Sequence, residues 1–387
     1  MAEEYTTETL SVRAGYDRTH QKEHSEALFL TSSFIFDDCQ EASDIFSGKA
    51  SGNIYSRFTN PTVACFEKRL ALMEGGECCV ATATGMSAIS VCIQSLLSAG
   101  DHIISSQSIF GSTTVLFDSH LSRFGIKTSY VDLTDIESFK NAIQPTTKVI
   151  FIESPSNPLM EIGNIKSLSA LAKQHNILLI VDNCFASPAL MQPIKLGADI
   201  SIQSATKSID GHGRMLGGAI IGSKKIVGEQ VYQFIKSNGS SMSAFNAWVF
   251  LNGLETLNLR MQEHSKRAYD LAKWLEKQPQ VTKVYYPFLK SFDQYDLAKK
   301  QQSAGGAILS FEIKGGKKEA WDLIDNTKLF SITANHGDTK STICHPATTT
   351  HSKISKQMRE KIGIKDNLIR ISTGLESLVD IKADLHF

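Results

Sequence analysis

The sequence predicts an α/β protein whose largest part is a mostly parallel sheet with helices on both faces. Three observations carry this prediction. Short apolar strands alternate with helical segments through the middle of the chain, which is typical of covered parallel sheets. Glycines stand where the helical periodicity ends, as at Gly75 and Gly100. Two residues with reactive side chains, Asp182 and Lys207, follow buried strands directly, as expected at the ligand-binding edge of such a sheet.

Residues typical of helix ends mark the first helices of the α/β part. Asn60-Pro61 is typical of a helix start, apolar residues recur at helical spacing from Val63 to Met73, and Gly75-Gly76 ends the helix. A strand is expected over Cys78–Ala83. A second amphipathic helix then begins near Met86 and ends by Gly100.

The alternation continues with further strands, each a short apolar run. Together with Cys78–Ala83 they predict a sheet of the seven-stranded type. These strands are His102–Ser105, Thr128–Asp132, Val149–Glu153, Ile177–Asp182, Ile200–Ser204 and Gly218–Ile221.

The last third of the chain predicts a smaller α+β domain. A long helix is expected from about Glu255 to Lys277, followed by strands over Val281–Tyr286, Ala307–Ile313 and Leu368–Ser372. We therefore divide the chain into an N-terminal arm (1–60), a large α/β domain (61–255) and a C-terminal domain (256–387).

Composition excludes several classes of partner. The 387 residues include 40 Lys and Arg against 40 Asp and Glu, so no net charge attracts nucleic acid or an anionic membrane. The N-terminus is acidic, and the longest aliphatic run, Ile177 to Val181, is far shorter than a membrane span. The seven cysteines form no CxxC pair and lie mostly in apolar segments. They are expected to be buried thiols in a reducing compartment, which places the protein in the cytoplasm.

Lys207 and Asp182 predict the chemistry. Lys207 follows a buried strand, with hydroxyls at Ser204 and Thr206 and several glycines nearby. A lysine that is desolvated by its neighbours loses its proton and forms an imine with an aldehyde. Asp182 ends another apolar strand, where it is either a helix cap or the partner of a buried cation. Pyridoxal phosphate needs this pair, because a lysine binds its aldehyde and a carboxylate keeps its ring nitrogen protonated.

The phosphate of such a cofactor needs its own binding site. The turn Thr84-Gly85-Met86 leads from a strand into a helix, whose N-terminal N–H groups can hold a dianion. Gly85 has an alternative explanation, since it also permits close packing of helix and sheet. Arg57 offers a guanidinium for the phosphate and Tyr55 a phenol, although a surface ion pair is the alternative for Arg57.

These segments resemble the pyridoxal-phosphate enzymes of cysteine and methionine metabolism, in the γ-replacement and γ-elimination branch of the aspartate-aminotransferase-like fold (fold type I). The resemblance covers nearly the whole chain. The matching motifs are Tyr55-Ser-Arg57-Phe-Thr-Asn-Pro-Thr, Ala83-Thr-Gly-Met86, Glu153-Ser-Pro-Ser-Asn157-Pro, Val181-Asp-Asn-Cys-Phe-Ala-Ser-Pro, Ser204-Ala-Thr-Lys207, Gly337-Asp-Thr-Lys-Ser, His345-Pro-Ala-Thr-Thr-Thr-His and Asn367-Leu-Ile-Arg-Ile-Ser-Thr-Gly-Leu-Glu376.

The resemblance implies a role for each matching position. Lys207 would bind the cofactor aldehyde and then move protons, Asp182 would pair with the pyridine nitrogen, and Asn157 would lie near the ring's 3′ oxygen. The substrate α-carboxylate would be bound by Arg370. The residues that would contact the phosphate are Gly85, Met86, Ser204 and Thr206, together with Tyr55 and Arg57 from a neighbouring subunit, which implies a homo-oligomer, usually a homotetramer built from dimers.

Two positions narrow the substrate class. Phe110 stands where most of the family has a tyrosine that stacks on the cofactor ring, so stacking remains and the phenol is lost. Asn335 stands where relatives often have a serine beside the substrate carboxylate. His336 stands where relatives commonly have an apolar residue. Phe110, the segment from Asp210 to Gly218 and Ser331-Ile-Thr-Ala-Asn335 are similar to O-succinylhomoserine sulfhydrylases. This similarity implies that O-succinylhomoserine and sulfide react to give homocysteine and succinate, a step of methionine biosynthesis.

Other reactions remain open within the family. Cystathionine γ-synthase uses cysteine as the nucleophile, an O-acetylhomoserine sulfhydrylase uses another ester, and cystathionine or methionine γ-lyases break their substrates down. Outside the family, Gly211-x-Gly213-x-x-x-Gly217 resembles a dinucleotide fingerprint, but its last gap is too long and it follows a lysine. No HExxH motif or Cys/His cluster predicts a metal site.

Overall fold

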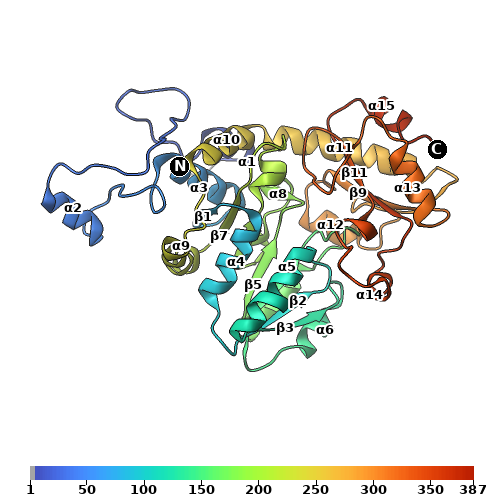
Figure 1. Ribbon diagram of the computed structural model, residues 1–387, viewed down its shortest axis with the longest axis horizontal. Helices are drawn as coiled ribbons and strands as arrows, with labels where there is room; N and C mark the ends of the chain where they lie inside the picture. Colours follow the sequence, from blue (N-terminus) through green and yellow to red (C-terminus); the bar gives the residue numbers. More distant parts are fainter. Residues whose placement is uncertain (1–4) are drawn as a thin grey trace.

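The computed structural model describes residues 5–387 and contains two sheets (Figure 1). The larger sheet has seven strands in the order β1-β7-β6-β5-β4-β2-β3, of which only β7 runs against its neighbours. The predicted mostly parallel sheet is therefore confirmed, and its strand ends differ from the predicted ones by at most two residues. They are β1 (Cys78–Thr82), β2 (His102–Ser106), β3 (Lys127–Val131), β4 (Thr147–Glu153), β5 (Leu178–Asp182), β6 (Ile200–Gln203) and β7 (Gly218–Gly222).

The helix that precedes β1 shows why this sequence folds as predicted. The Asn60 side chain accepts hydrogen bonds from the N–H groups of Thr62 and Val63 at the start of α3 (Pro61–Glu74). Gly75 ends the helix with φ of +75°, a conformation that costs glycine little. The next helix, α4 (Gly85–Leu96), begins directly after β1, so its N-terminus lies at the carboxyl edge of the sheet.

Helices cover both faces of the large sheet. Alternate residues of one strand belong to different apolar clusters: Ile150 and Ile152 pack on the side of α3, Val149 and Phe151 on the side of α4. The other helical segments of this part are α5 (Gly111–Val115), η2 (Leu116–His120), η3 (Leu121–Phe124), α6 (Ile136–Asn141), α7 (Ile165–Gln174), α8 (Ser187–Leu190), η4 (Pro193–Leu196), η5 (Ala205–Ile209), η6 (Lys224–Val231), α9 (Tyr232–Asn238) and α10 (Ala244–Glu255).

The smaller sheet has five strands in the order β10-β11-β12-β9-β8. The predicted helix over 255–277 is α11, which begins after a break at Thr256 and leads from the end of α10 toward this sheet (Figure 1). Strands β10 and β11 were not predicted, because two or three residues are too few to show a period. The elements are α11 (Leu257–Leu275), β8 (Val281–Tyr285), α12 (Tyr295–Gln301), β9 (Ile308–Ile313), α13 (Lys317–Asp325), β10 (Ser331–Ile332), β11 (Thr342–Cys344), η7 (Pro346–Thr348), α14 (Lys356–Lys361), β12 (Leu368–Ser372) and α15 (Leu378–Ala383).

The residues before α3 form α1 (Thr7–Arg13) and an extended segment with one short helix, α2 (Cys39–Phe46), which extends away from both sheets (Figure 1). Helix α2 buries none of its residues, and Ile35 beside it is 97% exposed. Cys39 is therefore exposed, and the expectation of buried thiols is wrong for this cysteine because its helix has nothing packed against it. Across residues 5–387, no helix combines the length and apolarity needed to span a bilayer.

Candidate active site

A cavity of about 520 Å³ lies where the carboxyl ends of β4, β5 and β6 face the smaller sheet. Glu153 and Asp182 end β4 and β5, Ser204 follows β6, and Arg370 enters from β12. All of the predicted site residues line this cavity except Tyr55 and Arg57. The structure thus brings together residues from two sheets that are up to 285 positions apart in the sequence, from Gly85 to Arg370.

Lys207 lies on η5, immediately after β6. Its backbone (φ −87°, ψ −128°) is not helical and interrupts η5 at this residue. Its Nζ donates a hydrogen bond to Oδ1 of Asn335 over 2.5 Å. Burial lowers the pKa of Lys207, and the charge of Arg370 lowers it further, while Cys184 acts in the opposite direction. A lysine with a lowered pKa is more often neutral, which is the form that reacts with an aldehyde.

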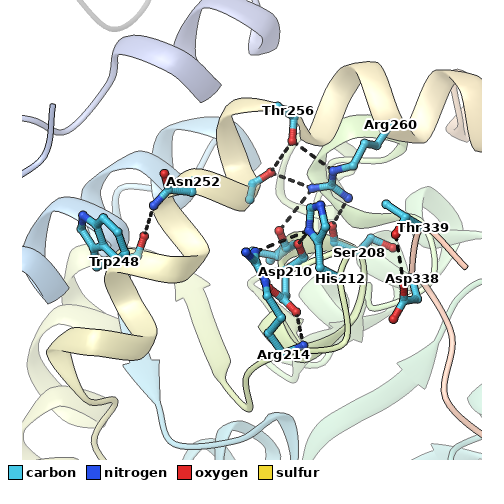
Figure 2. A network of polar contacts seen from close by, with 12 residues as sticks. Ser208, Asp210, His212, Arg214, Trp248, Asn252, Thr256, Arg260, Asp338 and Thr339 are labelled. Carbon is cyan, nitrogen blue, oxygen red and sulfur yellow. Dashed lines mark hydrogen bonds and ion pairs between the residues drawn. The ribbon is translucent and has the colours of Figure 1, made fainter. Parts of the chain in front are cut away.

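The segment after Lys207 is held by a buried arginine from α11 (Figure 2). Arg260 donates to the carbonyl oxygens of Ser208 (2.7 Å), Ile209 (3.3 Å) and Gly253 (2.7 Å). Gly211 lies so close that a Cβ there would be 2.0 Å from Nη1 of Arg260. Burial lowers the pKa of Arg260 to about 10. The guanidinium of Arg260 therefore ties the backbone segment after Lys207 to α10 and α11.

Two carboxyl groups lie side by side at the ends of β4 and β5. Glu153 and Asp182 are paired in the register of these parallel strands. Oδ1 of Asp182 accepts from the N–H of Cys184 (3.1 Å), and Glu153 accepts from the N–H groups of Phe110 (2.8 Å) and Asn157 (3.2 Å). Burial raises the pKa of both groups, and the charge of Asp182 raises that of Glu153 further. The sequence assigned no role to Glu153, although its place at the end of a predicted strand was a signal.

An anion-binding arrangement lies at the N-terminus of α4. The Thr84 side chain accepts from the N–H of Ser87, and the N–H groups of Gly85 and Met86 at the first two helical positions have no intrahelical partner. A Cβ on Gly85 would lie 2.9 Å from Cβ of Ser204, so a glycine is what allows the helix end to approach the β6 loop. The hydroxyl of Thr206 accepts from the N–H of Gly217 (3.0 Å) and fixes the other side of this loop.

Arg370 lies at the opposite end of the cavity and is 2% exposed. Its Nη1 donates to Oδ1 of Asn157 (2.9 Å) and its Nη2 to the carbonyl of Ala334 (2.7 Å). Its Nε is buried without a hydrogen-bond partner. Among the described residues, no carboxylate forms a direct ion pair with Arg370, although its charge acts on Glu153 in the same cavity.

Tyr55 and Arg57 lie apart from the cavity in this single chain. Tyr55 is 40% exposed, and Arg57 donates to the carbonyl of Lys236 and lies 4.4 Å from the ring centroid of Phe58. Other residues outside the predicted site set also line the cavity, among them Cys184, Phe185, His336 and Thr350. Cys184 and Phe185 closely follow Asp182, His336 follows Asn335, and Thr350 lies in a motif that matches the family, so each had a signal in the sequence.

The donor set fits an aromatic aldehyde that carries a phosphate. The N-terminus of α4 suits a dianion, the amine of Lys207 suits an aldehyde, and Asp182 suits a protonated ring nitrogen. The tight approach of Gly85 to Ser204 and the buried amine of Lys207 are the structural observations behind this fit. Within residues 5–387, no group of three or more His, Cys, Asp or Glu side chains converges as a metal site would require.

Comparison with known proteins gives consistent results over the whole chain. The profile of the Cys/Met metabolism PLP-dependent enzyme family matches residues 8–387. The chain is 53% identical over 378 residues to an O-succinylhomoserine sulfhydrylase of Pseudomonas aeruginosa (98% of this chain, 94% of the relative), and 39% identical over 383 residues to an L-methionine gamma-lyase of Fusobacterium nucleatum (98% and 97%). Its fold superposes with a TM-score of 0.94 and 35% identity on a putative O-acetylhomoserine (thiol)-lyase from Campylobacter jejuni (98% and 99%), whose structure contains a pyridoxyl-lysine monophosphate.

Proposed function

The chain belongs to the Cys/Met metabolism PLP-dependent enzymes, and from this premise we propose that it converts O-succinylhomoserine and sulfide into homocysteine and succinate. One observation carries the proposal: a single cavity is lined by Lys207, Asp182 and Arg370, and Nε of Arg370 is left without a hydrogen-bond partner. These three groups suit an amino acid whose Cα proton is to be removed. The choice of ester and nucleophile is supported by the 53% identity to the O-succinylhomoserine sulfhydrylase of Pseudomonas aeruginosa.

The cofactor is held by the groups around the sheet edge. Pyridoxal phosphate, when bound, withdraws electrons from the substrate Cα and so makes its proton acidic. Gly85, Met86, Ser204 and Thr206, which line the cavity, would hold the phosphate. Asp182 would pair with the ring nitrogen, Phe110 would stack on the ring and Asn157 would bind the 3′ oxygen, and all three also line the cavity.

Lys207 moves the protons. Because burial lowers its pKa, its neutral amine takes the proton from the substrate Cα. It must give this proton up again, to the conjugated system that the cofactor would supply, before it takes a second proton from Cβ. Loss of these protons allows the Cγ–O bond to break, and succinate leaves with the electron pair. Hydrosulfide then forms the Cγ–S bond, and Lys207 returns protons to Cβ and Cα. Asn335, which accepts from Nζ of Lys207 over 2.5 Å, orients the amine, and Arg370 binds the α-carboxylate.

The active unit is a homo-oligomer, a tetramer built from dimers. The extended segment before α3 supports this, since Leu30, Ile35 and Phe46 are 70%, 97% and 65% exposed in one chain. Burying such apolar groups against a second copy is favourable. In that assembly Tyr55 and Arg57 would reach the phosphate in the neighbouring subunit's site. The unpaired cysteines suit the reducing cytoplasm.

A second reaction has a specific observation in its favour. The match to the L-methionine gamma-lyase covers almost the same length as the match to the sulfhydrylase. γ-Elimination from methionine would use the same two proton abstractions by Lys207, with hydrolysis in place of sulfide addition.

A substrate matrix tests the proposal. Purified enzyme is incubated with O-succinyl-, O-acetyl- or O-phosphohomoserine, each with sulfide, with cysteine or with no added nucleophile, and with methionine alone. We expect homocysteine and succinate to form fastest from the succinyl ester with sulfide. Cystathionine formation with cysteine as the preferred nucleophile, or faster breakdown of methionine, would overturn the proposal in favour of a synthase or a lyase. Release of succinate without homocysteine would contradict it as well.

A further inference from the structure

His336 is a buried imidazole that lines the active-site cavity without a hydrogen bond. It is 7% exposed, and its Nδ1 is enclosed without any partner among the described residues. Its ring packs edge-on against Phe185, with 4.5 Å between the ring centroids. Leaving a buried polar group unsatisfied costs about 1–3 kcal/mol. A site that binds a polar ligand explains why this ring is placed here.

The loop that carries His336 is fixed on both sides. The carbonyl of Ala334 accepts from Arg370 (2.7 Å), and the N–H of Gly337 donates to Oγ of Ser372 (3.1 Å). Gly337 has φ of +79°, and a Cβ there would lie 2.7 Å from the backbone nitrogen of Ser208. The loop is therefore packed directly against the segment that carries Lys207, and His336 has a preset place in the cavity.

Both charged groups that act on the pKa of His336 are cations, Lys207 and Arg370, while the carboxyl groups of Glu153 and Asp182 line the same cavity. Burial lowers the pKa of His336 well below its usual value, and the charges of Lys207 and Arg370 lower it further, so the ring is neutral. Nε of Arg370 is buried and unpaired in the same cavity. Two unsatisfied groups that border one cavity, one a cation and one a neutral N–H donor, suit an anion with two oxygen atoms.

We propose that His336 is a substrate-binding residue that donates a hydrogen bond to the α-carboxylate of the amino-acid substrate, together with Arg370. The neutral ring carries one N–H group, and the tautomer protonated on Nδ1 uses the atom that is otherwise orphaned. The inference rests on the assignment of Arg370 to the carboxylate in the proposed function. It does not depend on which ester or nucleophile the enzyme uses.

A pair of ligands that differ only by the carboxylate tests the inference. L-2-Aminobutyrate has no leaving group at Cγ, and propylamine is the same molecule without the carboxylate. Their dissociation constants are measured by calorimetry on the holoenzyme, for the unchanged chain, His336→Leu and His336→Asn. We expect His336→Leu to raise the dissociation constant of L-2-aminobutyrate about tenfold, which corresponds to about 1.4 kcal/mol. The dissociation constant of propylamine should change less than about twofold. His336→Asn, which keeps a side-chain N–H, should recover part of the loss.

His345→Leu is the matched control. His345 is equally buried, at 3% exposure, but it binds the carbonyl of Asp366 and lies outside the cavity lining. This control should leave the ratio of the two dissociation constants unchanged. If His336→Leu does not fold, His336→Met replaces it.

An equal loss for both ligands, or no loss for either, would overturn the inference and leave His336 as a packing residue against Phe185. Because neither ligand is turned over, the result is independent of the substrate matrix. The substrate matrix can therefore fail while the role of His336 holds, and the role of His336 can fail while the proposed reaction holds.

Discussion

Nζ of Lys207 donates a hydrogen bond to Oδ1 of Asn335 over 2.5 Å. Lys207 follows β6 of the large sheet in the chain, whereas Asn335 lies between β10 and β11 of the small sheet. The two parts of the chain therefore share the group that carries the chemistry. The position of the reactive amine depends on both sheets being packed together, and the loop 334–337 is as much a part of the site as the strand ends of the large sheet.

Removing the amine of Lys207 should remove the covalent link to the cofactor. We expect purified protein to be yellow, with a visible band that borohydride bleaches, and Lys207→Ala to lose the bleachable band together with activity. Lys224→Ala, which removes an exposed lysine, should keep both. Absorption spectra before and after borohydride treatment provide the measurement. A colourless protein after incubation with excess pyridoxal phosphate would contradict the assignment.

Arg57 should act in the active site of a neighbouring subunit. Arg57→Ala and Lys207→Ala are each expected to be nearly inactive alone, because each lacks one part of every site. When the two are unfolded and refolded together, half of the dimers pair one copy of each, and one of the two sites in such a dimer is intact. Activity should recover to about one quarter of the unchanged enzyme. No recovery, with mixed oligomers shown to form by mass spectrometry, would mean that Arg57 does not act across subunits.

Arg260 should stabilise the segment that follows Lys207. Arg260→Met leaves the buried carbonyls of Ser208, Ile209 and Gly253 without their donor. We expect the free energy of unfolding to fall by about 3 kcal/mol and the dissociation constant of pyridoxal phosphate to rise, because the loop that presents Lys207 loses its support. Urea unfolding and cofactor titration measure the two effects. Lys266→Met, an exposed position on the same helix, should change stability by less than about 0.5 kcal/mol, and a similar loss there would refute the role of Arg260.

Glu74 should make the protein less stable as the pH rises. It is fully buried at the end of α3, with hydrogen bonds from Asn183, Ser201 and Gln203, and burial raises its pKa to about 7 from an ordinary value of 4.5. Between these two values the folded protein keeps a proton that the unfolded chain has released, so the free energy of unfolding falls with rising pH. The contribution is about 3 kcal/mol between pH 5 and pH 8.

Glu74→Gln, which cannot ionise, should abolish this part of the pH dependence in urea unfolding at the two pH values. Glu229→Gln, at an exposed carboxylate, is the control and should leave it in place. An unchanged slope in Glu74→Gln would show that Glu74 does not titrate in this range.

Much of the fold could be predicted because its signals are local. The cap at Asn60, the stop at Gly75 and the apolar runs of β1–β7 each need only a few neighbouring residues, and the structure places them within two residues of the predicted ends. The short strands β10 and β11 could not be predicted, because their pairing depends on β12, which follows β11 much later in the chain. The exposure of Cys39 was missed for the same reason, since an apolar pattern in α2 does not reveal whether anything packs on it.

The sequence by itself determined the fold class, the family and its cofactor, because the residues that carry the cofactor chemistry stand at the ends of predictable strands and in recognisable motifs. Only the tertiary structure decided which other groups share the cavity. Glu153 became the neighbour of Asp182 through the register of β4 and β5, and His336 became a cavity group because its loop packs against Ser208. Burial then raised the pKa of Glu153 and lowered that of His336, since other parts of the chain remove water from both groups and so disfavour their charged forms.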